Sequence, residues 1–143
     1  MNFKYRKFPV DSSNCPFSQK KSALRPVIQI DFSGENSDFG YYVLIDPGAD
    51  YCIFHASVGE QIGLKIKEGK ELIFYGTSGE PQKAYFHQIK FKIGGIKHEC
   101  FVGFSYDMNK LTYGILGQDG FFNKWSIKFE YTKEKIEIKN SAS

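Results

Sequence analysis

Apolar and polar residues alternate along most of this chain with a period of two, which is typical of half-buried β-strands. The alternating or β-favouring runs predict strands at 26–32, 41–45, 51–54, 71–75, 82–86, 87–93, 96–104, 126–131 and 135–139. Turns rich in Gly or polar residues separate them at 33–38, 76–81, 94–95 and 132–134. The pattern therefore predicts an all-β domain that contains several hairpins.

Three segments depart from this alternation. Residues 56–62 are compatible with a short helix in which Ser57 is the N-cap and Gly63 ends the helix. Residues 118–124 have the composition of one or two helical turns. Residues 1–24 are polar without a clear period, so we expect an N-terminal arm that covers the domain or stays mobile. The predicted organisation is an arm at 1–24 and one folded domain at 25–140.

The length of 143 residues suits a single domain, and 14 Phe and 9 Tyr favour strands over helices. The formal net charge is +3, and Lys residues alternate with Glu instead of clustering. Nucleic-acid binding normally needs a one-sided basic patch, so we expect no nucleic-acid partner. A small barrel that binds nucleic acid through its Lys-rich strands is the weakest alternative.

Localisation and cofactors follow from further absences in the sequence. No stretch approaches the about 18 apolar residues of a membrane span, and no apolar segment follows the charged N-terminus, so we expect neither membrane nor signal peptide. The cysteines are few and widely spaced: Cys15, Cys52 and Cys100. They form no disulfide framework, which indicates a reducing cytoplasm. The three histidines have no metal-ligand spacing, so we expect no metal and no cofactor.

The candidate chemistry lies where the apolar run 41–45 ends in Asp46. Pro47 and Gly48 break the strand at once, so the carboxylate sits at a half-buried turn. Such a group is either a structural hydrogen-bond acceptor or a catalytic acid–base. The local sequence alone does not separate these two interpretations.

Three ordered features resemble the retropepsin-like aspartic proteases, the single-domain relatives of pepsin. They are the strand that leads into Asp-Pro-Gly-Ala-Asp at 46–50, the Gly-tipped hairpin at 71–86, and the Gly-Ile-Leu-Gly-Gln-Asp run at 114–119 before a short helical segment. The resemblance covers roughly residues 25–131. It implies a closed or partly open acid-protease-like β-barrel with a flap hairpin and one or two short helices. It also implies that 115–119 pack beside the loop that carries Asp46.

The resemblance further implies an aspartic endopeptidase that acts on a peptide or protein substrate as a homodimer. Asp46 of each protomer would supply half of a carboxylate pair that activates water, without a covalent intermediate or a metal. The implied substrate-binding residues are Gly48, Ala49 and Asp50 in the loop and Gly76, Thr77, Ser78 and Gly79 at the flap tip.

Two positions depart from the family pattern. Pro47 stands where the family has Thr or Ser, and it lacks the hydroxyl and the N–H that grip the partner loop. Gln118 replaces an Arg that orients the carboxylate of Asp50, so we expect Asp50 to be held less firmly. The alternative function is therefore a catalytically impaired, protease-like dimerisation or peptide-binding module.

Overall fold

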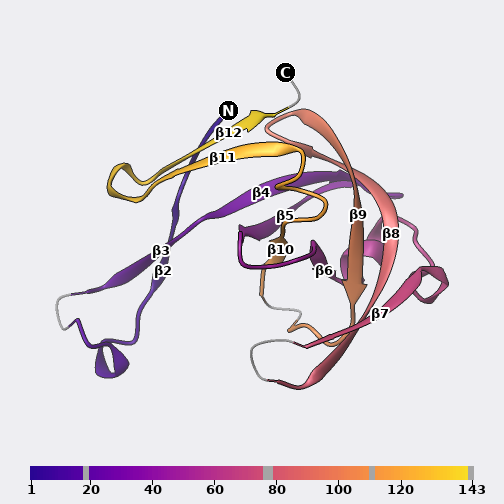
Figure 1. The fold of residues 1–143 in the computed structure, drawn as a ribbon, viewed down its shortest axis with the longest axis horizontal. Helices are drawn as coiled ribbons and strands as arrows, with labels where there is room; N and C mark the ends of the chain where they lie inside the picture. The colour runs from indigo at the N-terminus through magenta and orange to yellow at the C-terminus, as the bar shows by residue number, and fades with distance from the viewer. Residues whose placement is uncertain (18–19, 76–78, 110–111, 142–143) are drawn as a thin grey trace.

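In the computed structural model, which describes residues 1–17, 20–75, 79–109 and 112–141, six strands close into a barrel (Figure 1). Their order around the barrel is β4 (Val27–Ser33), β5 (Asp38–Ile45), β10 (Gly114–Leu116), β6 (Ile53–His55), β9 (Ile96–Ser105) and β8 (Pro81–Ile93). A pairing between Asp31 and Lys92 joins β8 to β4 and closes the barrel. The predicted all-β barrel is thus confirmed in its closed form.

The strand that leads to the candidate site, β5, has a paired neighbour on each side. β5 pairs antiparallel with β4 and parallel with β10, in the register Val43 to Gly114 and Ile45 to Leu116. Val43 and Ile45 are buried, as the period-two pattern requires for the inner face of a strand. Because β5 is fixed on both sides, the residue that follows Ile45 is placed rigidly.

The core is largely aromatic. The ring of Phe54 from β6 lies 6.1 Å from Phe32, 5.9 Å from Phe91 and 6.0 Å from Phe104, measured between ring centroids. All four rings are buried. Burial of a Phe side chain contributes about 1.5–3 kcal/mol, so this cluster is a main source of stability.

The hairpin predicted at 71–86 is confirmed by the antiparallel pairing of β7 (Lys70–Tyr75) with β8. β7 lies outside the closed ring and β8 is one continuous strand, where the sequence indicated two adjacent strands. The backbone N–H of Lys83 donates to Asp107 Oδ2 at 2.8 Å, and the Lys83 carbonyl accepts from Ser105 Oγ at 2.7 Å. The hairpin is therefore fastened to the end of β9 at one residue.

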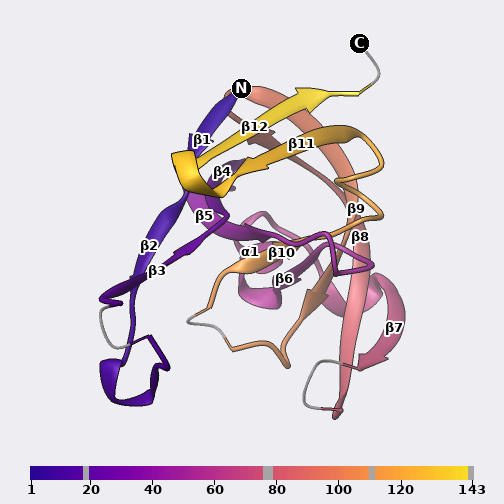
Figure 2. The ribbon, with the colours of Figure 1, turned by 60° about the vertical axis from the view of Figure 1, so that its left-hand side comes forward.

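Residues 1–24 contain strands that the sequence analysis did not predict. β1 (Asn2–Lys4) pairs with β12 (Lys135–Asn140), which also pairs with β11 (Trp125–Glu130), and the Met1 ammonium donates to the Ile138 carbonyl at 2.8 Å. β2 (Arg6–Pro9) and β3 (Ser22–Arg25) form a two-stranded arm that projects away from the barrel (Figures 1 and 2). A 3₁₀ turn at Ser12–Asn14 lies within this arm.

The helical content is small. α1 (Ala56–Gln61) is present, but His55 is its N-cap because its Nδ1 accepts the Ser57 N–H at 3.0 Å, so the expected Ser57 cap was wrong. Gly63 follows the helix with φ of 87°, as expected for its end. Further 3₁₀ turns are Ile66–Glu68 and Tyr131–Lys133. Within the described residues, no helix has the length and apolar character needed to span a lipid bilayer.

Candidate active site

Asp46 occupies a tight turn directly after β5. Its backbone N–H donates to the Leu116 carbonyl at 3.0 Å, and its own carbonyl accepts the Ala49 N–H at 3.2 Å. Its carboxylate oxygen Oδ1 accepts the Gly48 N–H at 2.9 Å. The half-buried side chain is therefore oriented by the turn that it caps. This geometry satisfies the structural interpretation of Asp46 and also leaves its second oxygen available for chemistry.

The segment after β10 holds the loop 46–50 from the other side. The Gln118 N–H donates to the Ala49 carbonyl at 2.8 Å, and the Asp119 N–H donates to the Asp50 carbonyl at 2.9 Å. A parallel bridge joins Tyr51 to Asp119. The expectation that 115–119 pack beside the Asp46 loop is confirmed.

This close approach requires glycine at position 117. A Cβ added to Gly117 would collide with the Tyr51 carbonyl oxygen and lie 2.7 Å from the Ala49 carbonyl oxygen. Both obstacles are backbone atoms, which cannot move aside without shifting the loop. The second Gly of the Gly-Ile-Leu-Gly run is therefore a packing requirement of the site.

Gln118 makes a contact that the sequence analysis did not anticipate. Its side-chain Nε2 donates to the Pro47 carbonyl oxygen at 2.7 Å. The exposed Asp50 carboxylate accepts no hydrogen bond within the described residues. The amide therefore stabilises the turn after Asp46 and does not orient the Asp50 carboxylate. The signal in the sequence was the substitution at 118, but its new partner depends on the loop geometry.

The remaining predicted site residues fall into two groups. Gly48, Ala49 and Asp50 share the loop with Asp46, and Gly48 and Asp50 are exposed. Gly79 is exposed, has φ of 77°, and has open space where a Cβ would project. The other three flap-tip residues, Gly76, Thr77 and Ser78, lie outside the described residues. Their assignment to substrate binding stays a prediction.

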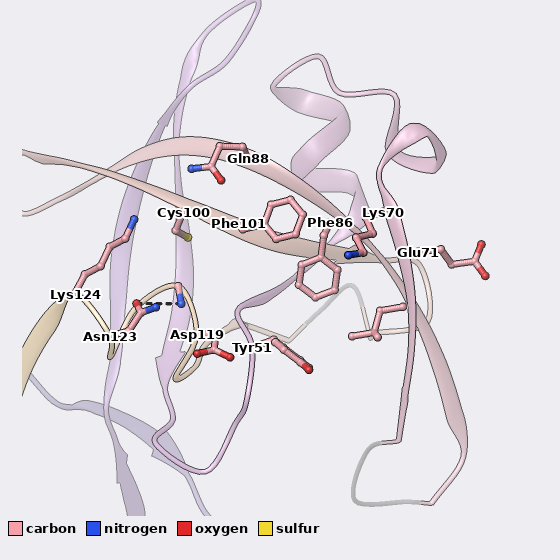
Figure 3. A pocket seen from close by; sticks show the side chains of 12 residues that line it. Tyr51, Lys70, Glu71, Phe86, Gln88, Cys100, Phe101, Asp119, Asn123 and Lys124 are labelled. Atoms are coloured by element: carbon pink, nitrogen blue, oxygen red, sulfur yellow. Dashed lines mark hydrogen bonds between the residues drawn. The ribbon is translucent and has the colours of Figure 1, made fainter.

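A cavity of about 440 Å³ adjoins the loop and was missed by the sequence reasoning (Figure 3). Its aromatic wall is formed by Tyr51, Phe86 and Phe101, with ring centroids 5.6 Å and 5.4 Å apart in succession. Asp119 and Lys124 add charged groups to the wall. The cavity joins Tyr51 with residues from β7, β8, β9 and the turn after β10, so no local pattern in the sequence marks it.

The turn at 118–124 is anchored by a buried histidine. It consists of successive hydrogen-bonded turns in place of the predicted helical segment. His98 accepts the Trp125 Nε1–H at Nδ1, 2.9 Å away, and its Nε2 lies 2.8 Å from the Gly120 carbonyl oxygen. Nε2 therefore carries the proton and the ring is neutral. Burial lowers the pKa of His98 below its ordinary value.

Among the described residues, no group of three or more His, Cys, Asp or Glu side chains is arranged to hold a metal ion. The chemistry that this arrangement itself offers is that of a carboxylate. Asp46 can accept or donate a proton, and a second carboxylate close to it would allow both actions at once.

Comparisons with known proteins agree with this geometry. A family profile described as "Aspartyl protease" matches residues 34–119, which is more than half of the chain and contains Asp46 and the 114–119 segment. No curated protein matches the sequence at a significant level.

Two solved structures are similar in shape. EIAV protease in complex with the inhibitor HBY-793 has a TM-score of 0.48 and 16% identity, over 73% of this chain and 88% of that chain. A foamy viral protease-reverse transcriptase in complex with an RNA/DNA hybrid has a TM-score of 0.41 and 22% identity, over 65% of this chain and 11% of that chain. The profile match over residues 34–119 shows that the chain belongs to the aspartyl protease family.

Proposed function

We propose that this chain is an aspartic endopeptidase that acts as a homodimer, with Asp46 of each protomer forming half of the catalytic pair. The observation that carries the proposal is the placement of Asp46 at the end of β5, in a loop held by backbone hydrogen bonds from Gln118 and Asp119. Membership of the aspartyl protease family supports peptide-bond hydrolysis as the reaction.

The dimer is required because each chain offers one such loop. Two carboxylates about 3 Å apart cannot both ionise, so the pair holds one proton between them. The ionised member removes a proton from water while the protonated member donates to the scissile carbonyl group. The pair titrates as one unit, so the proton belongs to neither Asp46 alone.

Substrate recognition is assigned to the two segments around this pair. Gly48, Ala49 and Asp50 would bind the substrate main chain, and the tip of the β7–β8 hairpin would close over it as a flap. Small residues permit such a close approach, and β7 lies outside the closed ring, where movement leaves the barrel intact. A cytoplasmic location belongs to the same proposal and is supported by three free cysteines.

The test is cleavage of an unstructured, hydrophobic-rich protein between about pH 4 and 7, with and without pepstatin. The matched control for Asp46→Asn is Asp38→Asn, because Asp38 is an exposed carboxylate at the opposite end of β5. Wild type and Asp38→Asn should cleave, while Asp46→Asn should lose about 100-fold or more of the rate. Equal inactivity of wild type and Asp46→Asn, at concentrations where sedimentation shows a dimer, would refute the enzyme.

A second candidate function is supported by one specific residue. Pro47 has neither the N–H nor the hydroxyl that the family uses beneath the carboxylates, and its carbonyl is taken by Gln118. A dimerisation or peptide-binding module without catalysis accounts for this substitution. An inert dimer that binds hydrophobic peptides, and binds them equally well as Asp46→Asn, would favour this second function.

A further inference from the structure

Two buried thiols from distant parts of the chain meet beneath the candidate active site. Cys52 precedes β6 and Cys100 lies in β9, and their exposed fractions are 0% and 1%. A Cβ added to Gly120 would lie 3.1 Å from the Cys52 sulfur and 3.6 Å from the Cys100 sulfur. Both sulfurs therefore face the same small space under the turn at 118–124.

Cys52 is also connected to the loop of Asp46. Its sulfur accepts the backbone N–H of Gly117 at 3.4 Å. The next residue, Gln118, donates its N–H to the Ala49 carbonyl and its side-chain amide to the Pro47 carbonyl. Two consecutive residues, Gly117 and Gln118, thus connect the Cys52 sulfur to the Asp46 turn at Pro47 and Ala49.

The aromatic-walled cavity brings small molecules to one member of this pair. Cys100 lines the cavity, and Figure 3 shows its side chain among Gln88, Phe101 and Lys124. A volume of about 440 Å³ is far larger than a peroxide molecule, whose size is close to that of one or two waters. Cys100 therefore borders the cavity, and Cys52 is fully buried beside Gly120, close to Cys100.

The two thiols differ in acidity. A hydrogen bond with Cys100 lowers the pKa of Cys52, with a smaller contribution from the Gly117 N–H in the same direction. The same hydrogen bond, together with burial, raises the pKa of Cys100. Cys52 is thus the member that ionises first and attacks an oxidant, and Cys100 is the resolving thiol.

We propose that Cys52 and Cys100 form a reversible disulfide in the presence of hydrogen peroxide, and that this bond loosens the loop of Asp46. The Cys52 thiolate attacks one peroxide oxygen and gives a sulfenic acid, with the other oxygen leaving as water after protonation. The Cys100 thiol then attacks the Cys52 sulfur and expels a second water. Two thiols and one peroxide thereby yield one disulfide and two waters.

The structural consequence follows from the length of the new bond. Disulfide sulfurs lie about 2.05 Å apart, so the two sulfurs must close to that distance, and we expect the Cys52 sulfur to leave the Gly117 N–H. The 117–119 segment then loses one of its attachments to the barrel. The effect on activity rests on the proposed peptidase function, whereas the disulfide itself does not.

The first test is chemical and needs no activity. Full-length wild type and Cys15→Ala are treated with hydrogen peroxide, the remaining thiols are alkylated, and the peptides are mapped by mass spectrometry. The expected product is one linked pair of peptides that contain Cys52 and Cys100, which disappears on treatment with dithiothreitol. If both peptides stay unlinked in folded protein under conditions that oxidise Cys15, the proposal is wrong.

The second test measures the loop and the activity. Trp125, the sole tryptophan, packs on His98 beside Gly120, so its fluorescence should change on oxidation of Cys15→Ala and recover on reduction. Cys100→Ala and Cys52→Ser should show neither the change on oxidation nor the recovery on reduction. Two variants are used in case one fails to fold, and Ser at position 52 keeps an acceptor for the Gly117 N–H. A fluorescence change that persists in both variants contradicts the proposal. Reduced Cys15→Ala without peptidase activity counts against the proposed function alone.

Discussion

The side-chain amide of Gln118 lies 2.7 Å from the carbonyl oxygen of Pro47 and donates a hydrogen bond to it. The contact joins residues that are 71 positions apart in the sequence. It places the two departures from the family pattern in direct contact. The Asp46 turn is therefore stabilised by a contact within the chain itself.

Loss of the hydrogen bond between Gln118 and Pro47 should lower the stability of the fold slightly and disturb the Asp46 turn more. Gln118→Ala removes an exposed hydrogen bond, so the free energy of unfolding should fall by about 0.5–1.5 kcal/mol. Urea unfolding followed by Trp125 fluorescence measures the difference. Gln61→Ala, an exposed amide at the end of α1, is the matched control and should change stability less. Equal effects would show that the Pro47 contact contributes nothing specific.

Restoring the donors at position 47 should strengthen the proposed dimer. Pro47→Thr adds a hydroxyl and an N–H in each protomer, and each hydrogen bond contributes about 0.5–1.5 kcal/mol. A gain of about 1.4 kcal/mol corresponds to a tenfold lower dissociation constant, so we expect a decrease of about tenfold or more. Sedimentation equilibrium measures the constant. An unchanged dissociation constant would show that contacts elsewhere, in residues 1–24 or 126–139, already hold the two protomers together.

Stability should decrease as the pH falls because of His98. Burial lowers its pKa in the folded protein, so the unfolded chain, with an ordinary His pKa of about 6.5, binds the proton more readily. The stabilisation from neutral His98 is complete above about pH 6.5 and is lost as the pH falls toward the lowered folded pKa. Urea midpoints at about pH 7.5 and 5.5 test this. In His98→Gln, which keeps an acceptor for Trp125, the difference between the two midpoints should be smaller.

Position 117 should tolerate no side chain. Gly117→Ala places a Cβ against the Tyr51 and Ala49 carbonyls, so stability should fall by about 3 kcal/mol or more, or soluble protein should not be obtained. Gly79→Ala is the comparison, because its Cβ meets open space and only the positive φ opposes it, at about 1–2 kcal/mol. Thermal unfolding of both variants ranks them. A Gly117→Ala protein as stable as Gly79→Ala would contradict the packing described for the site.

The barrel strands were predictable because local alternation and turn residues define them. Strands 26–32 and 87–93 alternate with period two, 41–45 is a β-favouring apolar run, and the position of Asp46 at a strand end follows from Pro47 and Gly48. The pairing of β1 with β12 was not predictable, because it joins residues more than 130 positions apart and a three-residue strand has almost no pattern.

The details of the site depend on tertiary geometry in the same way. His55 caps α1 through a ring nitrogen, which composition rules for caps do not include. The direction of the Gln118 amide is set by the approach of the 117–119 segment to the loop, and the cavity beside Tyr51 is assembled from four separate elements. These features are absent from any short window of sequence.

The hydrogen bonds of Lys83 with Ser105 and Asp107 set where the β7–β8 hairpin can bend. The N–H and the carbonyl of Lys83 are both held on the side away from β7, so this residue is the point at which the hairpin is attached. The next residue pair of the hairpin beyond this attachment is Phe74 with Gln82. Removing the Asp107 carboxylate would leave Lys83 held by Ser105 alone, and the next attachment to β9 is at Tyr85. Sequence changes in the 105–107 segment can thus alter where along its length the hairpin is attached to β9.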